Sequence, residues 1–571
     1  MPTRNRNRQV TATTLTLAIL AASPASILAA NLYWDANGTT AGAGDAPSGT
    51  WGTNSYWNSD ATGGGGGSFT PTTTGDDTLY FTAGDSSNNT TSAYTVTVDG
   101  TQSALGLKFQ SIGAATITGG TINLGTGGID IPRSVAPGTN NQAGVTINSN
   151  IALQGNQTWS SNSANATGFV VTGSVTGTAN LTLSQSANRP FNLTNSVNHT
   201  GTLTGTGNNT NGTIDVTGNI GSNVTDVIVN GTTTLRLSGN NSYSGNVTVG
   251  GTNFGIARLT IGSNTALTAG SNVTLTATTA TATSTLNLGN GANSYDVTVA
   301  GLNTDATTGS NIVTNNSTGT GTGTLTVNPD GAAAPADSTF GGIIQDGATA
   351  KVALTKAGSQ TLTLTGTNSY TGATTVTGGK LLVNGTHANS AVTVNGGTLG
   401  GSGTVAAVTV NAGGTLAPGN SIGTINITGN LSLAGALDVE LGRDTGTPTS
   451  DRTNVTGTVT FSDGADLKLT LYSGLDNAEL GDIFYLVSND DSDAITGKFT
   501  KLNGTATPLS EGSLFDWNSR QWQITYQANY DSSSFIGGND LAIQVVPEPA
   551  ALALLCLGGV ALLRRRRNGC A

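Results

Sequence analysis

Residues 354–384 read LTKAGSQTLTLTGTNSYTGATTVTGGKLLVN, and this stretch decides the fold. Leu362 and Leu364 alternate with Thr363, as expected on a pleated strand with one buried face. A segment rich in Gly, Asn and Thr follows, with Tyr370 as its single aromatic residue, and two further apolar runs complete the stretch. Glycine supplies the backbone conformations that tight corners need. The stretch therefore predicts one turn of a stacked β-structure.

The same pattern recurs when the chain is aligned on a leucine and a glycine eight residues apart. Residues 234–251 (TLRLSGNNSYSGNVTVGG) follow it closely, and residues 191–203 (FNLTNSVNHTGTL) follow it more weakly. The aligned positions are Leu193, Leu237 and Leu364; His199, Tyr243 and Tyr370; and Gly201, Gly245 and Gly372. One such unit cannot bury its own apolar face, so the repetition predicts a solenoid.

These segments resemble the autotransporter-associated β-strand repeat, a family found in long secreted passenger regions. The resemblance implies a β-helix. We therefore predict an all-β fold: a parallel β-helix (solenoid) over residues 101–430, with β-rich caps at its N- and C-terminal ends. A flexible polymer rich in Gly, Thr and Asn is the alternative, because such a composition also occurs in linkers.

Charge is scarce and unevenly placed. Charged residues make up 9% of the chain, and all 32 acidic residues lie between Arg8 and Arg564. This acidic body argues against nucleic acid as a partner, since phosphate neutralisation needs clustered Lys or Arg. Both cysteines, Cys556 and Cys570, lie in the C-terminal tail. The body therefore has no disulfide and depends on ladder hydrogen bonds and stacked side chains.

The first 30 residues read as a secretory signal peptide. They combine a basic start, a short apolar run from Thr14 to Ala22 and small residues before the mature chain. We expect cleavage near Ala29 or Ala30. The apolar run is too short to span a membrane.

Residues 31–100 are predicted to form an N-terminal cap. Trp34, Trp51 and Trp57 lie here, half of the six tryptophans. The end of a solenoid exposes unpaired strand edges and an open core, so it needs a segment of different composition to cover it. Stacking of these rings on sugars is the alternative interpretation.

Strand and turn patterns recur through residues 101–430. Apolar-Thr-apolar triplets occupy residues 247–249, 273–275 and 297–299, and Gly-Gly pairs precede Lys380, Thr398 and Thr415. Each cycle predicts one coil. From residue 431 the apolar strands lengthen and aromatic residues return, so residues 431–546 are predicted to be a C-terminal β-rich module.

The tail, residues 547–571, closely resembles the PEP-CTERM sorting signal. It contains Pro547, Glu548 and Pro549, an apolar run over residues 550–563, and then Arg564, Arg565, Arg566 and Arg567. The resemblance implies that an exosortase recognises the Pro-Glu-Pro triplet and removes the apolar segment. It also implies a Gram-negative-type envelope and delivery to the cell surface, outer membrane or medium.

The apolar run predicts a transient membrane stop. As a helix it would extend about 21 Å, less than the roughly 30 Å hydrocarbon core. The arginines after it should stay cytoplasmic, which places the body outside the cell. A plain, retained C-terminal anchor is the alternative.

Residues suited to catalysis are few. His199 and His387 occur in turn contexts without metal-ligand spacing; we expect corner packing for His199 and a solvated loop for His387. Asp305 and Asp330 are candidates for a glycosidase acid and base on adjacent coils, although each reads more simply as a turn residue. Residues 490–493 (DDSD) predict an acidic turn rather than a calcium loop.

We therefore predict a secreted, non-catalytic structural or adhesion protein of the cell surface or extracellular matrix, without cofactor or metal. The expected partners are an exosortase-type processing enzyme, the membrane through the C-terminal segment, and glycans or extracellular polysaccharide. The alternatives are a β-helix polysaccharide lyase or glycosidase, and a non-catalytic carbohydrate-binding protein.

Overall fold

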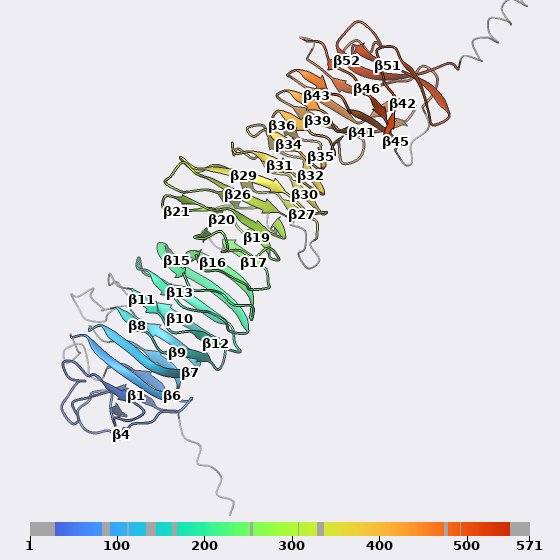
Figure 1. The fold of residues 1–571 in the computed structure, drawn as a ribbon. Helices are drawn as coiled ribbons and strands as arrows, with labels where there is room; N and C mark the ends of the chain where they lie inside the picture. Colours follow the sequence, from blue (N-terminus) through green and yellow to red (C-terminus); the bar gives the residue numbers. More distant parts are fainter. Residues whose placement is uncertain are drawn as a thin grey trace, which may run out of the picture.

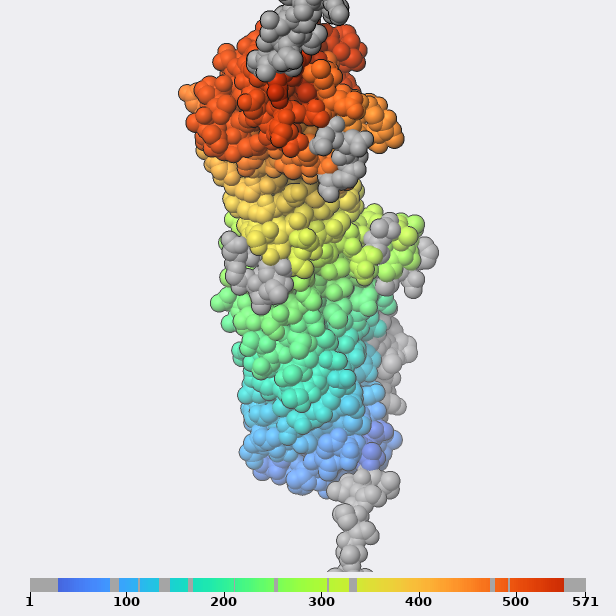
Figure 2. Space-filling model, turned by 90° about the vertical axis from the view of Figure 1, so that its right-hand side faces the viewer, coloured from blue at the N-terminus to red at the C-terminus, as the bar shows by residue number. Residues whose placement is uncertain are grey.

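A computed structural model describes residues 29–82, 92–110, 113–132, 144–162, 168–251, 255–305, 308–327, 336–472, 478–490 and 493–548. Every helix or strand assigned in these residues is a strand, which confirms the predicted all-β class. The strands stack into an elongated column, with the N-terminal end at one tip and the C-terminal end at the other (Figure 1). A view from the side shows the same continuous column (Figure 2). The predicted signal peptide, apart from Ala29 and Ala30, lies outside the described residues.

Five short strands form the N-terminal cap: β1 (Asn31–Trp34), β2 (Gly49–Trp51), β3 (Trp57–Asn58), β4 (Phe69–Thr70) and β5 (Thr78–Tyr80). β3 pairs antiparallel with both β1 and β4, whereas β1 and β5 are parallel. β2 and β5 each pair in parallel with β6, the first strand of the column. The cap is therefore joined to the column by continuous backbone hydrogen bonds.

Parallel strands continue from the cap through the first half of the column. They are β6 (Tyr94–Lys108), β7 (Ala115–Ile131), β8 (Val145–Ile147), β9 (Asn150–Leu153), β10 (Gln157–Ser161), β11 (Phe169–Val171), β12 (Val175–Gly177), β13 (Leu181–Gln185), β14 (Phe191–Leu193), β15 (Gly201–Val216), β16 (Val224–Leu237), β17 (Val247–Gly251), β18 (Ile256–Ile261), β19 (Asn272–Ala277), β20 (Thr283–Asn287), β24 (Gly301–Thr304), β25 (Ser310–Thr314) and β28 (Ile343–Ile344).

Long strands bend around the corners of this first half. β15 pairs with β13 near its start, where Leu203 lies beside Leu181, and with β14 near its end, where Ile214 lies beside Phe191. Each long strand thus contributes to two faces of one coil. Apolar residues fall in register on successive coils, so each coil buries its inward face on the next.

The second half of the column has three sheets. A nine-stranded, wholly parallel sheet contains β23 (Val297–Val299), β26 (Thr322–Val327), β29 (Lys351–Lys356), β31 (Thr374–Val376), β34 (Val392–Val394), β37 (Val408–Val410), β40 (Leu431–Leu433), β44 (Val459–Phe461) and β47 (Thr496–Gly497). A ten-stranded sheet contains β27 (Ser338–Phe340), β30 (Thr361–Leu364), β32 (Lys380–Val383), β35 (Gly397–Gly401), β38 (Gly414–Pro418), β41 (Ala436–Asp444), β42 (Thr447–Ser450), β45 (Asp466–Leu471), β48 (Lys501–Leu502) and β49 (Thr505–Ala506). An eight-stranded sheet contains β33 (Thr386–His387), β36 (Thr404–Val405), β39 (Thr424–Ile427), β43 (Arg452–Val455), β46 (Ile483–Ser488), β50 (Leu514–Trp517), β51 (Arg520–Ala528) and β52 (Asp540–Val546).

From β31 to β41 the chain visits these three sheets in strict rotation. One strand enters the nine-stranded sheet, the next the ten-stranded sheet and the third the eight-stranded sheet, and the cycle then repeats. Leucines form a direct ladder through the ten-stranded sheet: Leu362, Leu381, Leu399, Leu416, Leu437, Leu467 and Leu502. All of them are buried, so the Leu-Thr alternation of the sequence corresponds to an inward and an outward face.

The cycle predicted from the apolar-Thr-apolar triplets is interrupted after the second triplet. Residues 247–249 pair with residues 273–275 as the triplet spacing suggests, but residues 297–299 (β23) begin the nine-stranded sheet instead. β19 pairs with β24, the strand that follows β23. A short antiparallel pair, β21 (Gly289–Asn290) with β22 (Asn293–Ser294), is inserted before β23. The third triplet therefore lies in a different sheet from the first two.

Parallel pairing continues past residue 430, so the change at residue 431 is one of composition. β38, β41, β45 and β48 pair in parallel on both sides of that point. At the far end, β46, β52, β51 and β50 pair antiparallel and cover the last coils. Within the described ranges, no helix is long and apolar enough to cross a membrane. The predicted membrane stop, residues 550–563, lies outside those ranges.

Candidate functional sites

The three N-terminal tryptophans lie inside the cap. Trp34, Trp51 and Trp57 are each 0% exposed. The Trp57 ring centroid lies 4.9 Å from that of Trp34 and 5.5 Å from that of Trp51. Phe81 extends this edge-to-face cluster and stacks on Phe109, the aromatic residue that follows β6. These rings therefore pack against one another as a buried cluster. The sugar-stacking alternative is wrong for these rings, because none has an accessible face.

His199 packs at a corner of the column, as predicted. Its side chain is 0% exposed, and burial lowers its pKa. In the described part of the chain, no three His, Cys, Asp or Glu side chains gather closely enough to hold a metal ion.

His387 was expected in a solvated loop, and this expectation is wrong. It lies on β33, which pairs with β36, and its side chain is 1% exposed. The ring centroid lies 4.6 Å from that of Tyr370. Burial lowers the pKa of His387 to about 4, so the ring is neutral at pH 7.

A hydroxyl network ties His387 to the coil before it. Thr374 Oγ1 lies 2.8 Å from His387 Nε2, 2.8 Å from the Tyr370 hydroxyl and 2.9 Å from Ser390 Oγ. Ser390 in turn donates to the carbonyl oxygen of Gly372. Burial raises the pKa of Tyr370, so this hydroxyl also stays neutral. All four side chains are buried, which makes the network a clamp between coils rather than a site that a substrate can reach.

Lys356 is a buried cation that the sequence interpretation missed. It is 0% exposed and occupies an inward position between Val327 and Val376 in neighbouring strands. Its Nζ donates to the carbonyl oxygens of Ala357 at 2.7 Å, Gly358 at 3.2 Å and Gly378 at 3.3 Å. The alternation of Leu354 and Lys356 with Thr355 was the signal that could have placed it inside.

Of the acid pair suggested from the sequence, the structure describes Asp305. Asp305 is exposed, and its backbone N–H donates to the carbonyl oxygen of Leu275. Asp330 lies outside the described residues, as do the two central residues of the acidic turn at 490–493.

A different group of carboxylates meets at a pocket of about 150 Å³ beside Lys380: Asp438, Glu440 and Asp451. Asp451 is 2% exposed, and burial raises its pKa to about 7. Its two oxygens accept the backbone N–H groups of Gly423 at 2.8 Å and Glu440 at 2.9 Å. These bonds join the start of β39 to β41, so Asp451 positions the backbone here.

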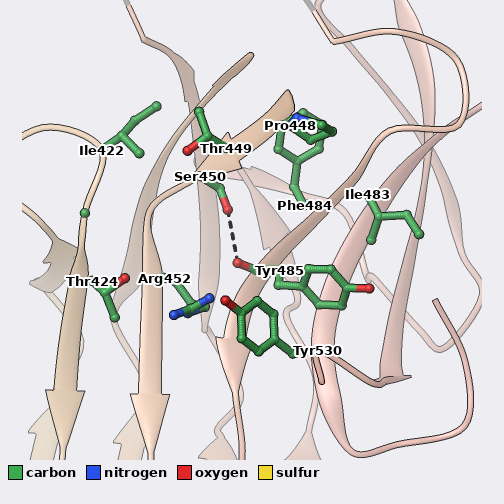
Figure 3. Close-up of a pocket in the computed structure, with 11 residues that line it drawn as sticks. Ile422, Thr424, Pro448, Thr449, Ser450, Arg452, Ile483, Phe484, Tyr485 and Tyr530 are labelled. Carbon is green, nitrogen blue, oxygen red and sulfur yellow. Dashed lines mark hydrogen bonds between the residues drawn. The ribbon is translucent and has the colours of Figure 1, made fainter. Parts of the chain in front are cut away.

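A larger pocket, of about 400 Å³, lies where β39, β42, β43 and β46 approach the loop that carries Tyr530 (Figure 3). Its lining is mostly polar and aromatic: Ile422, Gly423, Thr424, Pro448, Thr449, Ser450, Arg452, Ile483, Phe484, Tyr485 and Tyr530. Arg452 lies over the Tyr530 ring, with its guanidinium carbon 4.0 Å from the ring centroid. Tyr485 packs edge-on against Tyr530 at 5.2 Å, and its carbonyl oxygen accepts the Ser450 hydroxyl. We call this the Arg452 pocket.

The predicted sorting residues begin where the column ends. β52 finishes at Val546, and Pro547 and Glu548 follow as exposed residues without regular structure. Pro549 and Arg564–Arg567 lie outside the described residues. The column therefore presents the start of the tail to solvent.

Comparison with known families gives two matches. The family described as Passenger-associated-transport-repeat matches residues 227–252 and 354–383, and the PEP-CTERM protein-sorting motif matches residues 545–567. No curated protein matches the chain. Both resemblances are confirmed, the first over the two stronger segments; residues 191–203 lie outside the matched ranges. The chain thus carries passenger-associated repeats and a PEP-CTERM motif, which together indicate an exported, cell-surface protein of a Gram-negative-type bacterium.

Proposed function

We propose that this chain is a secreted, non-catalytic structural or adhesion protein, a parallel β-helix rod delivered to the cell surface or extracellular matrix. The PEP-CTERM match at residues 545–567 supports the delivery part of the proposal, because this motif implies processing by an exosortase-type system. The exposed position of Pro547 and Glu548, directly after β52, supports it. A processing enzyme can reach this segment without unfolding the column.

The β-helix assignment draws support from the pairing pattern. Strands enter three sheets in rotation, and each pairs in parallel with the strand one coil away. Such a column depends only on contacts between neighbouring coils, so it can be long without a large central core or disulfides. These properties suit an extended surface protein.

The proposal that the protein is not an enzyme draws support from where its titratable groups lie. The side chains of His199 and His387 are buried, and the two carboxylate oxygens of Asp451 accept hydrogen bonds from backbone N–H groups. General acid or base catalysis needs a group within hydrogen-bond reach of a substrate proton. A function through the outer surface of the rod fits this arrangement better than catalysis does.

A glycan-cleaving enzyme is the second candidate, and the shared pocket of Asp438, Glu440 and Asp451 favours it. Glycosidases use two carboxyl groups that flank the bond they cleave. The test is a turnover screen of the purified chain against plant and algal polysaccharides. Activity that is lost in Glu440→Gln, or in Asp305→Ala, would establish the enzyme; no turnover is the result that our proposal predicts.

The tail itself provides the test of delivery. In a host with an exosortase-type system, the wild-type chain should become accessible to added protease on intact cells or appear in the medium. Replacing Pro547, Glu548 and Pro549 together by alanine should retain the chain in the membrane fraction. Pro508→Ala, at an exposed proline elsewhere in the chain, serves as the matched control. Equal surface delivery of the tail variant would refute the proposed route.

A further inference from the structure

The Arg452 pocket contains a cation that is held in place but not neutralised. Arg452 Nε donates to Asn454 Oδ1 at 2.9 Å, and the guanidinium is stacked on Tyr530. In the described part of the chain, no carboxylate lies within 4.0 Å of this guanidinium, and no lining residue of the pocket is acidic. The structure therefore leaves the charge of Arg452 available to a ligand.

Two other arginines show the contrasting arrangement. Arg236 is paired with Asp215, and Arg443 with both Glu479 and Asp482. In those places a carboxylate of the chain already forms an ion pair with the guanidinium. Arg452 differs because its neighbours in the pocket carry hydroxyl groups and rings instead (Figure 3).

The geometry around Arg452 selects a planar anion. A guanidinium offers a rigid fork of donors that matches the two oxygens of a carboxylate, and stacking on an aromatic ring fixes the plane of that fork. Nε is already used by Asn454, which leaves the two terminal nitrogens for the ligand. Tyr485, edge-on to Tyr530, and the bond from the Tyr530 N–H to Asp540 Oδ2 hold the platform steady.

The remaining lining suits a sugar. Thr424, Thr449 and Ser450 place hydroxyl groups around the pocket, and Tyr530 is 37% exposed. Aromatic faces and hydroxyl groups are the partners that a pyranose ring uses. A volume of about 400 Å³ falls within the range of roughly 300–1,000 Å³ that is common for small-ligand pockets.

The charge of the whole chain limits the ligand further. The formal net charge is −11, so a dense polyanion would be repelled over the whole approach. An acidic unit set among neutral sugars avoids this repulsion while still presenting one carboxylate to Arg452.

We propose that the Arg452 pocket binds the carboxylate of a uronic-acid unit in an otherwise neutral extracellular glycan. The inference rests on the proposed export, which brings the pocket into contact with such glycans. The inference names the class of ligand for the surface role: a single acidic sugar unit of a glycan.

Binding is measured on the purified full chain by calorimetry or ligand-observed NMR, with D-glucuronate, D-glucose and acetate as probes. Glucuronate should bind. Glucose, which lacks the carboxylate, and acetate, which lacks the sugar ring, should each bind at least about tenfold more weakly. Arg452→Met should weaken glucuronate binding by about tenfold or more, and Arg452→Lys should weaken it less. Tyr530→Ala should also weaken it through loss of the platform. Arg520→Met, which removes one positive charge outside the pocket lining, should leave binding unchanged.

Several outcomes would overturn the assignment. No binding of glucuronate by the wild-type chain would refute it, and so would equal binding of glucose or of acetate. Loss of binding in Arg520→Met to the same degree as in Arg452→Met would place the effect in overall charge and not in the pocket. Circular dichroism of each variant confirms folding. Because binding is measured on purified protein, its failure is distinguishable from a failure of export.

Discussion

At the scale of single residues, the interior of this column contains polar side chains whose bonds run along the stack. Lys356 bonds to carbonyl oxygens on two successive coils, and Ser390, in the network of His387, donates to the carbonyl oxygen of Gly372 one repeat earlier. A buried polar group is costly unless it is hydrogen-bonded. These residues therefore fix the register of one coil on the next, which a uniformly apolar interior would not do.

Replacing Lys356 by alanine should destabilise the column. The change removes the donor to three carbonyl oxygens and leaves a cavity, so we expect a loss of about 3 kcal/mol in the free energy of unfolding. Lys356→Met, which keeps an unbranched side chain, should recover part of that loss. Lys351→Ala, at the exposed start of the same strand, is the control and should change stability by less than about 0.5 kcal/mol. Denaturant unfolding followed by circular dichroism measures all three, and equal effects of the two alanine variants would contradict this role.

His387 should make stability depend on pH on the acid side. Burial lowers its pKa from 6.5 to about 4, so the unfolded chain binds more protons between these values. The contribution of the neutral His387 ring to the free energy of unfolding is fully present above pH 6.5 and is lost as the pH falls toward 4. Between pH 7.5 and pH 5, the wild type should lose about 2 kcal/mol more than His387→Gln. Parallel stability curves for the two proteins would show that the ring does not titrate in this way.

At the scale of single elements, the repeat glycines explain how closely the coils approach. A Cβ added at Gly372 would lie 2.2 Å from the carbonyl oxygen of Val352, and one at Gly245 would lie 1.2 Å from that of Thr225. Both obstacles are backbone atoms of the preceding coil, which cannot rotate away. The leucine of the repeat thus fills the core, while its glycine permits stacking.

Gly372→Ala should therefore destabilise the column by about 2 kcal/mol or more, because the coils must separate to admit the methyl group. Gly270→Ala is the matched control: no atom lies within 4 Å of the added Cβ, so its effect should be small or slightly stabilising. Thermal unfolding of the two variants provides the comparison. A fully neutral Gly372→Ala would mean that the stacking distance is not set at this glycine.

At the scale of the whole molecule, the all-β class and the parallel pairing of successive strands were predictable from local patterns. The Leu-Thr alternation at residues 361–364 and the glycine pairs before Lys380, Thr398 and Thr415 identified strands that do pair coil on coil. The inserted pair β21–β22 was not predictable, because its Gly and Asn residues look like any other corner. The sequence therefore contains no sign that residues 297–299 lie in a different sheet from residues 273–275.

The sites were less predictable than the fold. Asp451 and Arg452 are adjacent in sequence, yet they line different pockets: Asp451 lies in the link between β42 and β43, and Arg452 begins β43. Tyr530 lies nearly eighty residues after Arg452 in the sequence. The antiparallel strands at the end of the column bring the two side chains into contact. Only the tail, a linear signal, could be identified from sequence alone, and the PEP-CTERM match confirms it.

The central claim is that a rod is exported and then released from its tail, and intact mass spectrometry of the protein recovered from the cell surface and medium tests it most directly. The account predicts one main species that lacks both the signal peptide, residues 1–30, and the apolar run and arginines that follow Pro549. A surface species that still carries residues 550–571 would contradict it and would establish a retained membrane anchor in place of sorting.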